Sequence, residues 1–234
     1  MNVTHAMILA AGLGTRMRPL TEAMPKPLIP VAGRPLIDWC LDWLNEAGIH
    51  KVVVNSSYLA QQLEAHVGSR AALSREGAPP LETGGGVAKA LPLLGRGPFL
   101  TMNADAIFTG PHPLPAMRAA WRDDNDFVML LVPRSRAIGW EGNGDFILDA
   151  GTIRRPQPGE VAEYIFTGAQ LMHPRVFEGC PEGAFSLSAL WKKSLGPDGW
   201  YQRIHAVVHE GMWLNVGDLA GLKAAEAYLA AHSS

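Results

Sequence analysis

The change from an apolar run to glycine near the start of the chain limits the possible fold most strongly. Residues 6–11 are all apolar, and Gly12 ends the run. A run this short cannot form the core of a helix, whereas an abrupt end at glycine is typical of a buried parallel strand. The segment is therefore expected to be a buried parallel strand that stops at Gly12.

Helix and strand patterns alternate after this first strand. Apolar residues recur with helical spacing at 34–47 and 58–67, and a β-branched run lies between them at 51–55. This order predicts an α/β fold, with a parallel sheet covered by helices on its faces. Ligands of such sheets bind beyond the carboxyl ends of the strands, where the first loop lies.

The loop after the first strand has the composition of a phosphate-binding loop. Gly12 and Gly14 leave backbone N–H groups without side-chain cover, so that an anion can approach them closely. Thr15 adds a hydroxyl, and Arg16 and Arg18 add two fixed positive charges. For a bare G-x-G, a surface turn with solvated arginines is the alternative interpretation.

A second cationic element follows at Lys26, which lies between Pro25 and Pro27. The prolines restrict the backbone on both sides of a point charge, which suits the positioning of a phosphate. Two other phosphate motifs are excluded. A dinucleotide fingerprint needs a glycine where the chain has Met17, and the Gly-Lys-Ser/Thr ending of a Walker A loop is absent.

The two segments together resemble the signature of the bacterial sugar-1-phosphate nucleotidyltransferases. The matching strings are G-x-G-T-R-M-R-P-L-T at 12–21 and P-K-P-L-x-P-V-x-G-R-P-L at 25–36. The resemblance implies a Rossmann-like, mostly parallel mixed sheet flanked by helices. It also implies that Arg16 holds the β and γ phosphates, that Lys26 contacts the α-phosphate region, and that the nucleotide lies against Ala11, Gly12, Gly14 and Thr15.

A glycine-rich segment at 81–86, Leu-Glu-Thr-Gly-Gly-Gly, precedes an apolar helical pattern at 87–94. Three glycines exclude side chains, as is useful where a flat ring lies on the main chain or a helix N-terminus faces an anion. A flexible loop is the alternative. By resemblance to the family, Glu82, Gly84 and Gly85 are expected to contact the nucleotide base.

A third segment, 98–105, is an apolar strand that delivers Asp105 at its carboxyl end. A carboxylate there supplies the hard oxygen ligand that Mg²⁺ on a triphosphate requires, although a strand-end Asp is often only a turn residue. The family resemblance favours the metal ligand and places Asn103 against the nucleotide. Ala104 departs from the pattern, because the family usually has glycine there.

The segment 213–218 resembles the W-x-D-x-G-T motif of the family, with two departures. Asn215 stands where a second metal-binding Asp is usual, and Asp218 replaces the threonine. Asn215 is therefore a candidate metal ligand, but its amide offers only a neutral carbonyl oxygen where Asp would offer a negative one.

The resemblance assigns sugar binding to residues 140–146 and 163–173. Asn143, Asp145 and Gly168 are the candidate sugar-binding residues, and a simple hairpin with an Asx turn is an equal alternative. Further helices are predicted at 112–122, 186–195 and 219–231, and further strands at 127–132 and 204–208. One domain is expected over 1–234, with a nucleotide-binding part at about 1–110 and a sugar-binding part at about 111–234.

Composition excludes several classes of partner. A formal net charge of −2 does not favour nucleic acid or an anionic membrane surface. No run approaches the ~18 apolar residues of a membrane span. Cys40 and Cys180 lack C-x-x-C spacing and are expected to fill the core. A cytoplasmic monomer or homodimer is expected.

The expected reaction is Mg²⁺-dependent transfer of a nucleotidyl group from a nucleoside triphosphate to a sugar 1-phosphate, with release of pyrophosphate. Within the family, L-E-T-G-G-G and G-x-G-D-F resemble the N-acetylmuramate 1-phosphate uridylyltransferases of peptidoglycan recycling, which implies UTP. Glucose or mannose 1-phosphate with dTTP or GTP is an alternative. A nucleotide-sugar sensor without activity is another, which Ala104 and Asn215 favour and which Arg16, Lys26 and Asp105 oppose.

Overall fold

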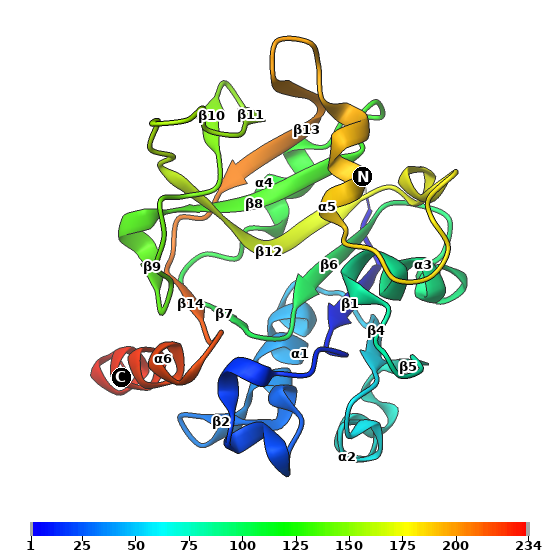
Figure 1. Cartoon of the computed structure of the whole chain (residues 1–234), viewed down its shortest axis with the longest axis vertical. Coiled ribbons are helices and arrows are strands. Elements are labelled where there is room, and N and C mark those ends of the chain that lie inside the picture. Colours follow the sequence, from blue (N-terminus) through cyan, green and yellow to red (C-terminus); the bar gives the residue numbers. More distant parts are fainter. Residues whose placement is uncertain (1, 233–234) are drawn as a thin grey trace.

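The computed structural model describes residues 2–232, and a nine-stranded mixed sheet forms its centre (Figure 1). The order across the sheet is β10-β11-β13-β8-β12-β6-β1-β4-β5. In chain order these strands are β1 His5–Leu9, β4 Lys51–Ser56, β5 Ala72–Arg75, β6 Phe99–Asn103, β8 Phe127–Pro133, β10 Ile147–Asp149, β11 Thr152–Arg154, β12 Tyr164–Met172 and β13 Trp200–Val208.

Strand β1 lies at the point where the order of the sheet reverses. It pairs in parallel with β4 on one side and with β6 on the other, and β4 continues in parallel to β5. Strand β12 then pairs antiparallel with both β6 and β8. The carboxyl ends of β1, β4 and β6 therefore meet at one edge, which is where α/β sheets bind their ligands.

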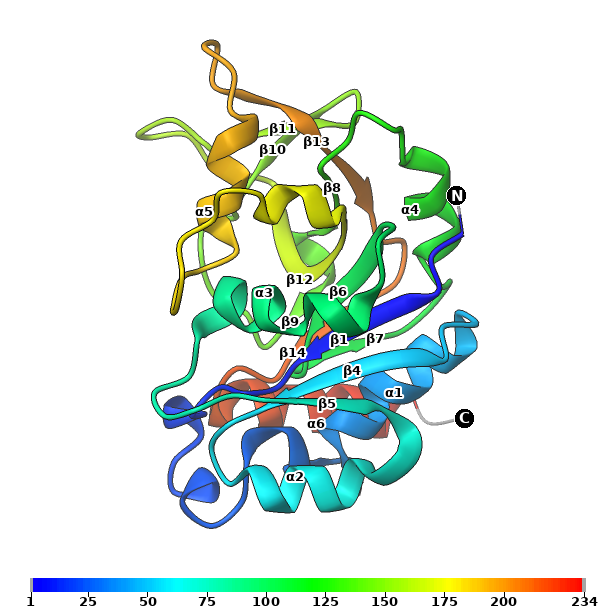
Figure 2. The same ribbon diagram turned by 90° about the vertical axis from the view of Figure 1, so that its right-hand side faces the viewer.

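Helices cover both faces of this sheet. They are α1 Leu36–Glu46, α2 Ala60–Val67, α3 Glu82–Leu94, α4 Leu114–Ala120, α5 Ser188–Trp191 and α6 Leu219–Ala231. Figure 2 shows α1 and α2 on one side of β1, β4 and β5, and α3 on the other. The predicted fold class is confirmed.

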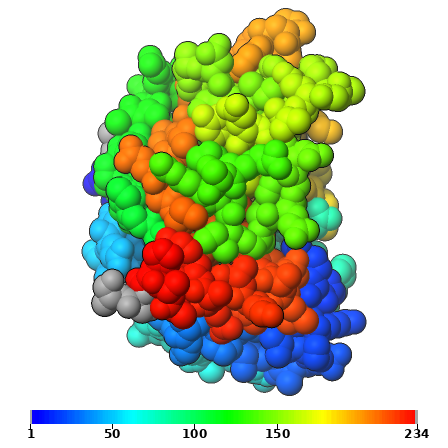
Figure 3. Space-filling view, turned by 90° about the vertical axis from the view of Figure 1, so that its left-hand side faces the viewer, coloured from blue at the N-terminus to red at the C-terminus, as the bar shows by residue number. Residues whose placement is uncertain are grey.

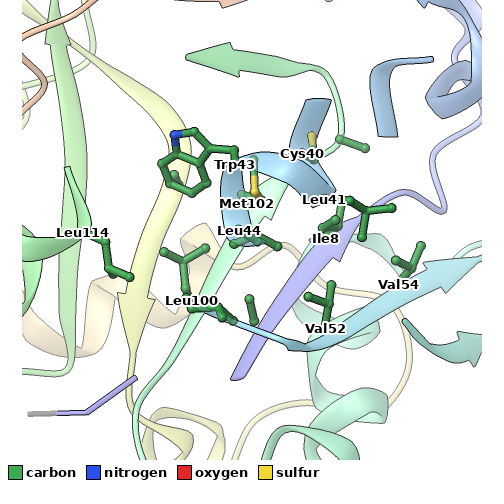
Figure 4. Close-up of a cluster of buried hydrophobic side chains, with 14 of the residues drawn as sticks. Ile8, Cys40, Leu41, Trp43, Leu44, Val52, Val54, Leu100, Met102 and Leu114 are labelled. Atoms are coloured by element: carbon green, nitrogen blue, oxygen red, sulfur yellow. The ribbon is translucent and has the colours of Figure 1, made fainter. Parts of the chain in front are cut away.

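The alternation of side chains along β1 divides the core into two layers. Ile8 points to the face of α1, where it packs in one cluster with Leu41 and Leu44 (Figure 4). Met7, its neighbour in sequence, packs on the opposite face in a cluster with Val87 of α3. A strand with both faces buried explains why residues 6–9 read as a continuous apolar run.

Cys40 belongs to the α1 layer and is fully buried. Burial raises the pKa of its thiol, and the nearby carboxylates of Asp105 and Asp38 raise the pKa further. The prediction that Cys40 fills the core is confirmed. Cys180 is only partly buried and packs at the margin of the α3 layer.

The C-terminal part of the chain returns to the first loop. A small sheet has the order β7-β14-β9, formed by Ala106–Phe108, Trp213–Asn215 and Ala137–Ile138. Helix α6 follows β14 and lies beside the N-terminal residues, as Figure 3 shows in red against blue. Leu214 and Val216 pack there in one buried cluster with Met17 and Val31. The C-terminal turn thus reaches the phosphate loop.

Two details differ from the sequence expectations. The helix expected at 87–94 begins earlier, because α3 starts at Glu82 and includes Gly84, Gly85 and Gly86, which rules out the alternative of a flexible loop. The helix predicted at 186–195 is shorter, since α5 covers Ser188–Trp191 and a 3-10 turn follows at Lys192–Ser194. The helix predicted at 219–231 is confirmed, and Asp218 caps it, where its Oδ1 accepts a hydrogen bond from the N–H of Gly221 at 2.9 Å.

Close packing explains the glycines of α3. The N–H groups of Gly84 and Gly85 donate to the carbonyl of Phe185 at 2.7 and 3.1 Å, so the first turn is satisfied by protein. A Cβ on Gly84 would overlap the ring of Phe185, and a Cβ on Gly85 would overlap the carbonyl oxygen of Gly183. These glycines therefore let α3 approach the 183–185 segment.

No helix among residues 2–232 is long and apolar enough to cross a membrane.

We predict that Gly85→Ala lowers the free energy of unfolding by about 1–3 kcal/mol, the usual cost of adding atoms to a packed interior. Alanine otherwise favours a helix over glycine by up to ~1 kcal/mol, so the sign of the change reports the packing. Urea denaturation followed by circular dichroism measures it. Gly97→Ala is the control for a glycine outside a helix with free space, because nothing lies within 4 Å of its Cβ position. Unchanged or higher stability of Gly85→Ala would contradict this role.

Candidate active site

A pocket of about 370 Å³ lies where the carboxyl ends of β1, β4 and β6 meet. Most of the residues predicted to hold the nucleotide and the phosphates line it. They are Ala11, Gly12, Gly14, Thr15, Arg16, Lys26, Glu82, Asn103 and Asp105. The tertiary structure therefore brings together residues from three segments that are far apart in the sequence.

The first loop is compact because Gly14 permits a close approach. Gly14 has φ +63°, in the left-handed region that favours glycine. Its carbonyl accepts hydrogen bonds from the N–H of Met17 and from Thr21 Oγ1, both at 2.9 Å. A Cβ on Gly14 would stand 3.0 Å from the Cβ of Lys26. The glycine thus brings the first loop against the lysine segment.

Lys26 and Asp105 form an ion pair at the pocket wall. Lys26 Nζ donates to Asp105 Oδ2 at 2.6 Å and contacts the carbonyl oxygen of Gly217 at 3.4 Å. Both side chains are mostly buried, with exposed fractions of 14% and 22%. Partial burial limits screening by water, so this contact is stronger than a surface ion pair.

Gly217 joins the C-terminal turn to both cations of the pocket. Its Cβ position lies 3.4 Å from Arg16 Nη1, while its carbonyl oxygen faces Lys26. The N–H of Val216 donates to the carbonyl of Asp105 at 2.9 Å, which holds the turn against the end of β6. A Cβ at 217 would stand 3.1 Å from Asn215 Nδ2, so glycine leaves room for the Asn215 amide beside the guanidinium.

Asn55 and Glu76 form a buried hydrogen-bond network that the sequence analysis missed. Asn55 Oδ1 accepts from the N–H of Ala10 at 2.6 Å, and Asn55 Nδ2 donates to Glu76 Oε1 at 2.6 Å. Glu76 Oε2 accepts from the N–H of Leu81 at 2.7 Å. Asn55 lies near the carboxyl end of a β-branched strand, much as Asp105 follows β6. Because ligands of α/β sheets bind beyond the carboxyl ends of the strands, this position alone would have identified Asn55 as a candidate.

Glu82 and Gly86 show how α3 fits this network. Glu82 lines the pocket with φ +58°, a backbone conformation that costs a side chain of this kind free energy. A Cβ on Gly86 would stand 2.5 Å from Glu76 Oε1, so glycine leaves room for the buried carboxylate. The conformation of the first turn of α3 therefore accommodates the buried hydrogen bonds of Glu76 and Asn55.

Several predicted site residues do not line the pocket. Gly84 and Gly85 face the 183–185 segment instead, and close approach of a base does not explain them. Asn143, Asp145, Gly168 and Asn215 lie outside the pocket lining. Among these, Gly168 is nevertheless adjacent to the pocket, because its Cβ position is 2.5 Å from Asn103 Nδ2.

Asp145 has a structural contact at the start of β12. Its Oδ2 accepts from the N–H of Phe166 at 3.0 Å, and Phe146 bridges Tyr164 in antiparallel fashion. The carbonyl of Asn143 accepts from the N–H of Ala162 at 3.1 Å. The segment at 143–146 is thus tied to the strand that carries Gly168.

Asn215 is tied to the neighbouring segment. Its Nδ2 donates to the carbonyl oxygen of Gly139 at 3.1 Å, and its backbone pairs with Ala106, next to Asp105. The amide therefore already has a structural partner on its nitrogen.

The pocket suits a divalent cation only with help from a ligand. Within residues 2–232, no group of three or more His, Cys, Asp or Glu side chains could hold a metal ion. Asp105 offers one carboxylate at the pocket wall. Mg²⁺ needs only one or two carboxylates when phosphate oxygens and water complete its shell, so the residues present fit a metal carried by a triphosphate.

The comparisons with known proteins agree with this geometry. Residues 6–209 match the family model described as the MobA-like NTP transferase domain. Two relatives match nearly the whole chain, and both are N-acetylmuramate alpha-1-phosphate uridylyltransferases. The protein of Caulobacter vibrioides is 42% identical over 96% of each chain. That of Neisseria meningitidis is 37% identical over 95% of this chain and 96% of its own.

The chain therefore belongs to the MobA-like NTP transferase family, among the sugar-1-phosphate nucleotidyltransferases. Solved structures share its fold at low sequence identity. HddC from Yersinia pseudotuberculosis, complexed with GMP-PN, has a TM-score of 0.76 at 20% identity and covers 97% of this chain and 100% of its own. The inositol-1-phosphate CTP transferase of T. maritima has a TM-score of 0.74 at 17% identity, covering 97% and 96%.

We predict that Gly168→Ala lowers kcat/KM by between about 10- and 100-fold, because its methyl group would push Asn103 away from the pocket. Gly151→Ala is the matched control. Gly151 has a similar φ of +86°, but its Cβ position meets only His205, at 3.7 Å. Gly151→Ala should lose about 1–2 kcal/mol of stability for its positive φ, and Gly168→Ala should lose more, because Asn103 must also move. Equal activities of the two variants would show that Gly168 has no influence on the active site.

Proposed function

We propose that this protein transfers a uridylyl group from UTP to N-acetylmuramate 1-phosphate, giving a UDP-sugar and pyrophosphate. The observation that carries the proposal is the contact of Lys26 with Asp105, next to Arg16, at the head of the parallel strands. Two cations and one carboxylate at this place can bind two phosphate groups and a metal ion. The names of the two similar uridylyltransferases support the choice of base and sugar.

The nucleotide would lie across the pocket with its triphosphate on the first loop. Arg16 and Lys26 supply positive charge there, and the backbone of Gly12 and Gly14 allows close approach of phosphate oxygens. The base would lie toward Glu82 at the start of α3. The triphosphate would thus lie beside Arg16, Lys26 and Asp105, and the base beside Glu82.

The reaction would be an in-line displacement at the α-phosphorus. An oxygen of the sugar 1-phosphate forms the new bond to phosphorus, and the bond to the bridging oxygen of pyrophosphate breaks. The attacking oxygen is already ionised at neutral pH, so no general base is needed. The chain's task is to hold two anions together and to stabilise charge on the transferred group.

Lys26 would exchange partners when substrates bind. In the free protein its ammonium group neutralises Asp105. We propose that Asp105 holds Mg²⁺ together with phosphate oxygens, which releases Lys26 to contact the α-phosphate. Mg²⁺, when bound, neutralises charge that develops on the phosphates. Residues 111–234 would supply the sugar-binding part, with Gly168 next to Asn103 as the junction.

We predict that Arg16→Ala and Lys26→Ala each lower kcat by roughly 10²-fold or more, the scale for losing a donor aimed at transition-state charge. Thermal stability should change little in Arg16→Ala, since Arg16 is exposed. Arg18→Ala is the matched control, because Arg18 is equally exposed but does not line the pocket. Pyrophosphate release with UTP and N-acetylmuramate 1-phosphate is the assay. Near wild-type rates in both site variants would overturn the assignment.

A second prediction concerns Asn215. Asn215→Asp removes the donor to Gly139 and adds a negative oxygen near Asp105. We expect a lower Mg²⁺ concentration for half-maximal rate and a loss of about 1 kcal/mol in stability. The Mg²⁺-dependent rise in melting temperature with UTP present and the sugar 1-phosphate absent provides an independent readout. Asp105→Asn should nearly abolish turnover.

Equal Mg²⁺ requirements in the wild type and Asn215→Asp would remove Asn215 from the metal site. A wild type that is silent at every Mg²⁺ concentration, and that Asn215→Asp makes active, would support a nucleotide-sugar sensor instead.

A further inference from the structure

Two adjacent arginines in the sugar-binding part have different surroundings. Arg154 forms a two-pronged pair with Glu160, with Nη1 and Nη2 each 2.6 Å from a carboxylate oxygen. This contact lowers the pKa of Glu160 to about 2. The side chain of Arg154 is only 19% exposed, whereas that of Arg155 is 47% exposed. Arg154 is thus engaged within the protein, and Arg155 is open to a ligand.

The guanidinium of Arg155 is held in place by aromatic rings rather than by a tight ion pair. Its Cζ lies 4.3 Å from the ring centroid of Phe146 and 5.8 Å from that of Trp191. Stacking on aromatic faces orients the planar group and leaves donors free along its edge. Arg155 Nη1 lies 3.7 Å from Asp145 Oδ1, which is too long for a hydrogen bond. Arg155 therefore keeps capacity for an anionic partner.

A chain of contacts links Arg155 to the pocket. Arg155 Nη1 donates to the carbonyl of Asp145 at 3.3 Å, and Asp145 Oδ2 accepts from the N–H of Phe166 at 3.0 Å. Phe166 precedes Gly168 by two residues on β12, and Gly168 lies against Asn103 of the pocket. The guanidinium thus belongs to the part of the chain proposed to bind the sugar, and it does not line the pocket that contains Arg16 and Lys26.

The proposed substrate carries a second anion apart from its phosphate. N-acetylmuramate bears a lactyl ether that ends in a carboxylate, whereas N-acetylglucosamine has a hydroxyl at the same carbon. A site that selects the first sugar needs a cation apart from those that bind phosphate. A guanidinium with a free edge binds a carboxylate with two parallel hydrogen bonds.

We propose that Arg155 binds the lactyl carboxylate and sets the preference for a carboxylated sugar 1-phosphate. This assignment rests on the proposed function. Asp145 positions Arg155 through its carbonyl and at the same time anchors β12. The partly exposed guanidinium recognises the sugar, and Phe146 keeps it from rotating away.

The test compares two sugars in the wild type, Arg155→Met, Arg155→Lys and Arg154→Met. The substrates are N-acetylmuramate 1-phosphate and N-acetylglucosamine 1-phosphate, each with UTP, and isothermal titration measures their binding separately. We expect Arg155→Met to lower kcat/KM and affinity for the carboxylated sugar by roughly 10- to 100-fold, the usual range for a charged hydrogen bond. The values for N-acetylglucosamine 1-phosphate should stay within about twofold.

The remaining variants separate recognition from structure. Arg155→Lys keeps the charge without the planar fork and should restore part of the discrimination. Arg154→Met breaks the pair with Glu160 and should affect both sugars equally. Equal losses for both sugars in Arg155→Met, or no loss, would overturn the assignment while the proposed function stands. A wild type that neither binds nor converts N-acetylmuramate 1-phosphate would overturn both.

Discussion

The ion pair between Lys26 and Asp105 joins three parts of the chain that are remote in sequence. Lys26 follows the first loop, Asp105 follows β6, and Gly217 in the C-terminal turn presents its carbonyl oxygen to the same ammonium group. Two partly buried charges at this distance attract each other in a low-dielectric surrounding, which offsets their loss of water. The pocket is therefore closed on one side before any ligand enters.

Another wall of the pocket is held by hydrogen bonds of the Asn55 amide and the Glu76 carboxylate. Asn55 bridges the N–H of Ala10 and the carboxylate of Glu76, which in turn accepts from the N–H of Leu81. Each buried polar atom of this bridge has a partner, as burial demands. The ends of β1 and β4 and the start of α3 are thereby held in one arrangement, and a nucleotide would find its walls preformed.

Glycine has two different uses around this pocket. At Gly14 it permits a positive φ and a close approach of the lysine segment, which belongs to the phosphate loop itself. At Gly85 it permits α3 to pack against the carbonyl of Gly183, and neither glycine lines the pocket. The same residue type in a motif thus serves binding in one case and packing in the other.

Local pattern was sufficient for the parts of this protein in which neighbours in sequence are neighbours in space. The apolar run at 6–11, the glycines and cations after it, and Asp105 behind its strand follow from periodicity and strand-end chemistry. The pocket lining includes the end of that run, both glycines of the first loop, Arg16, Lys26 and Asp105. The family membership also follows from these contiguous motifs.

Tertiary structure alone decided the contacts between distant segments. Gly85 is expected from its motif to contact the base, whereas the structure packs it against Gly183, and the sequence offers no signal for the hydrogen bond between Asn55 and Glu76. Such contacts depend on how strands are ordered and how closely a helix docks, which are long-range properties that no short window of sequence contains.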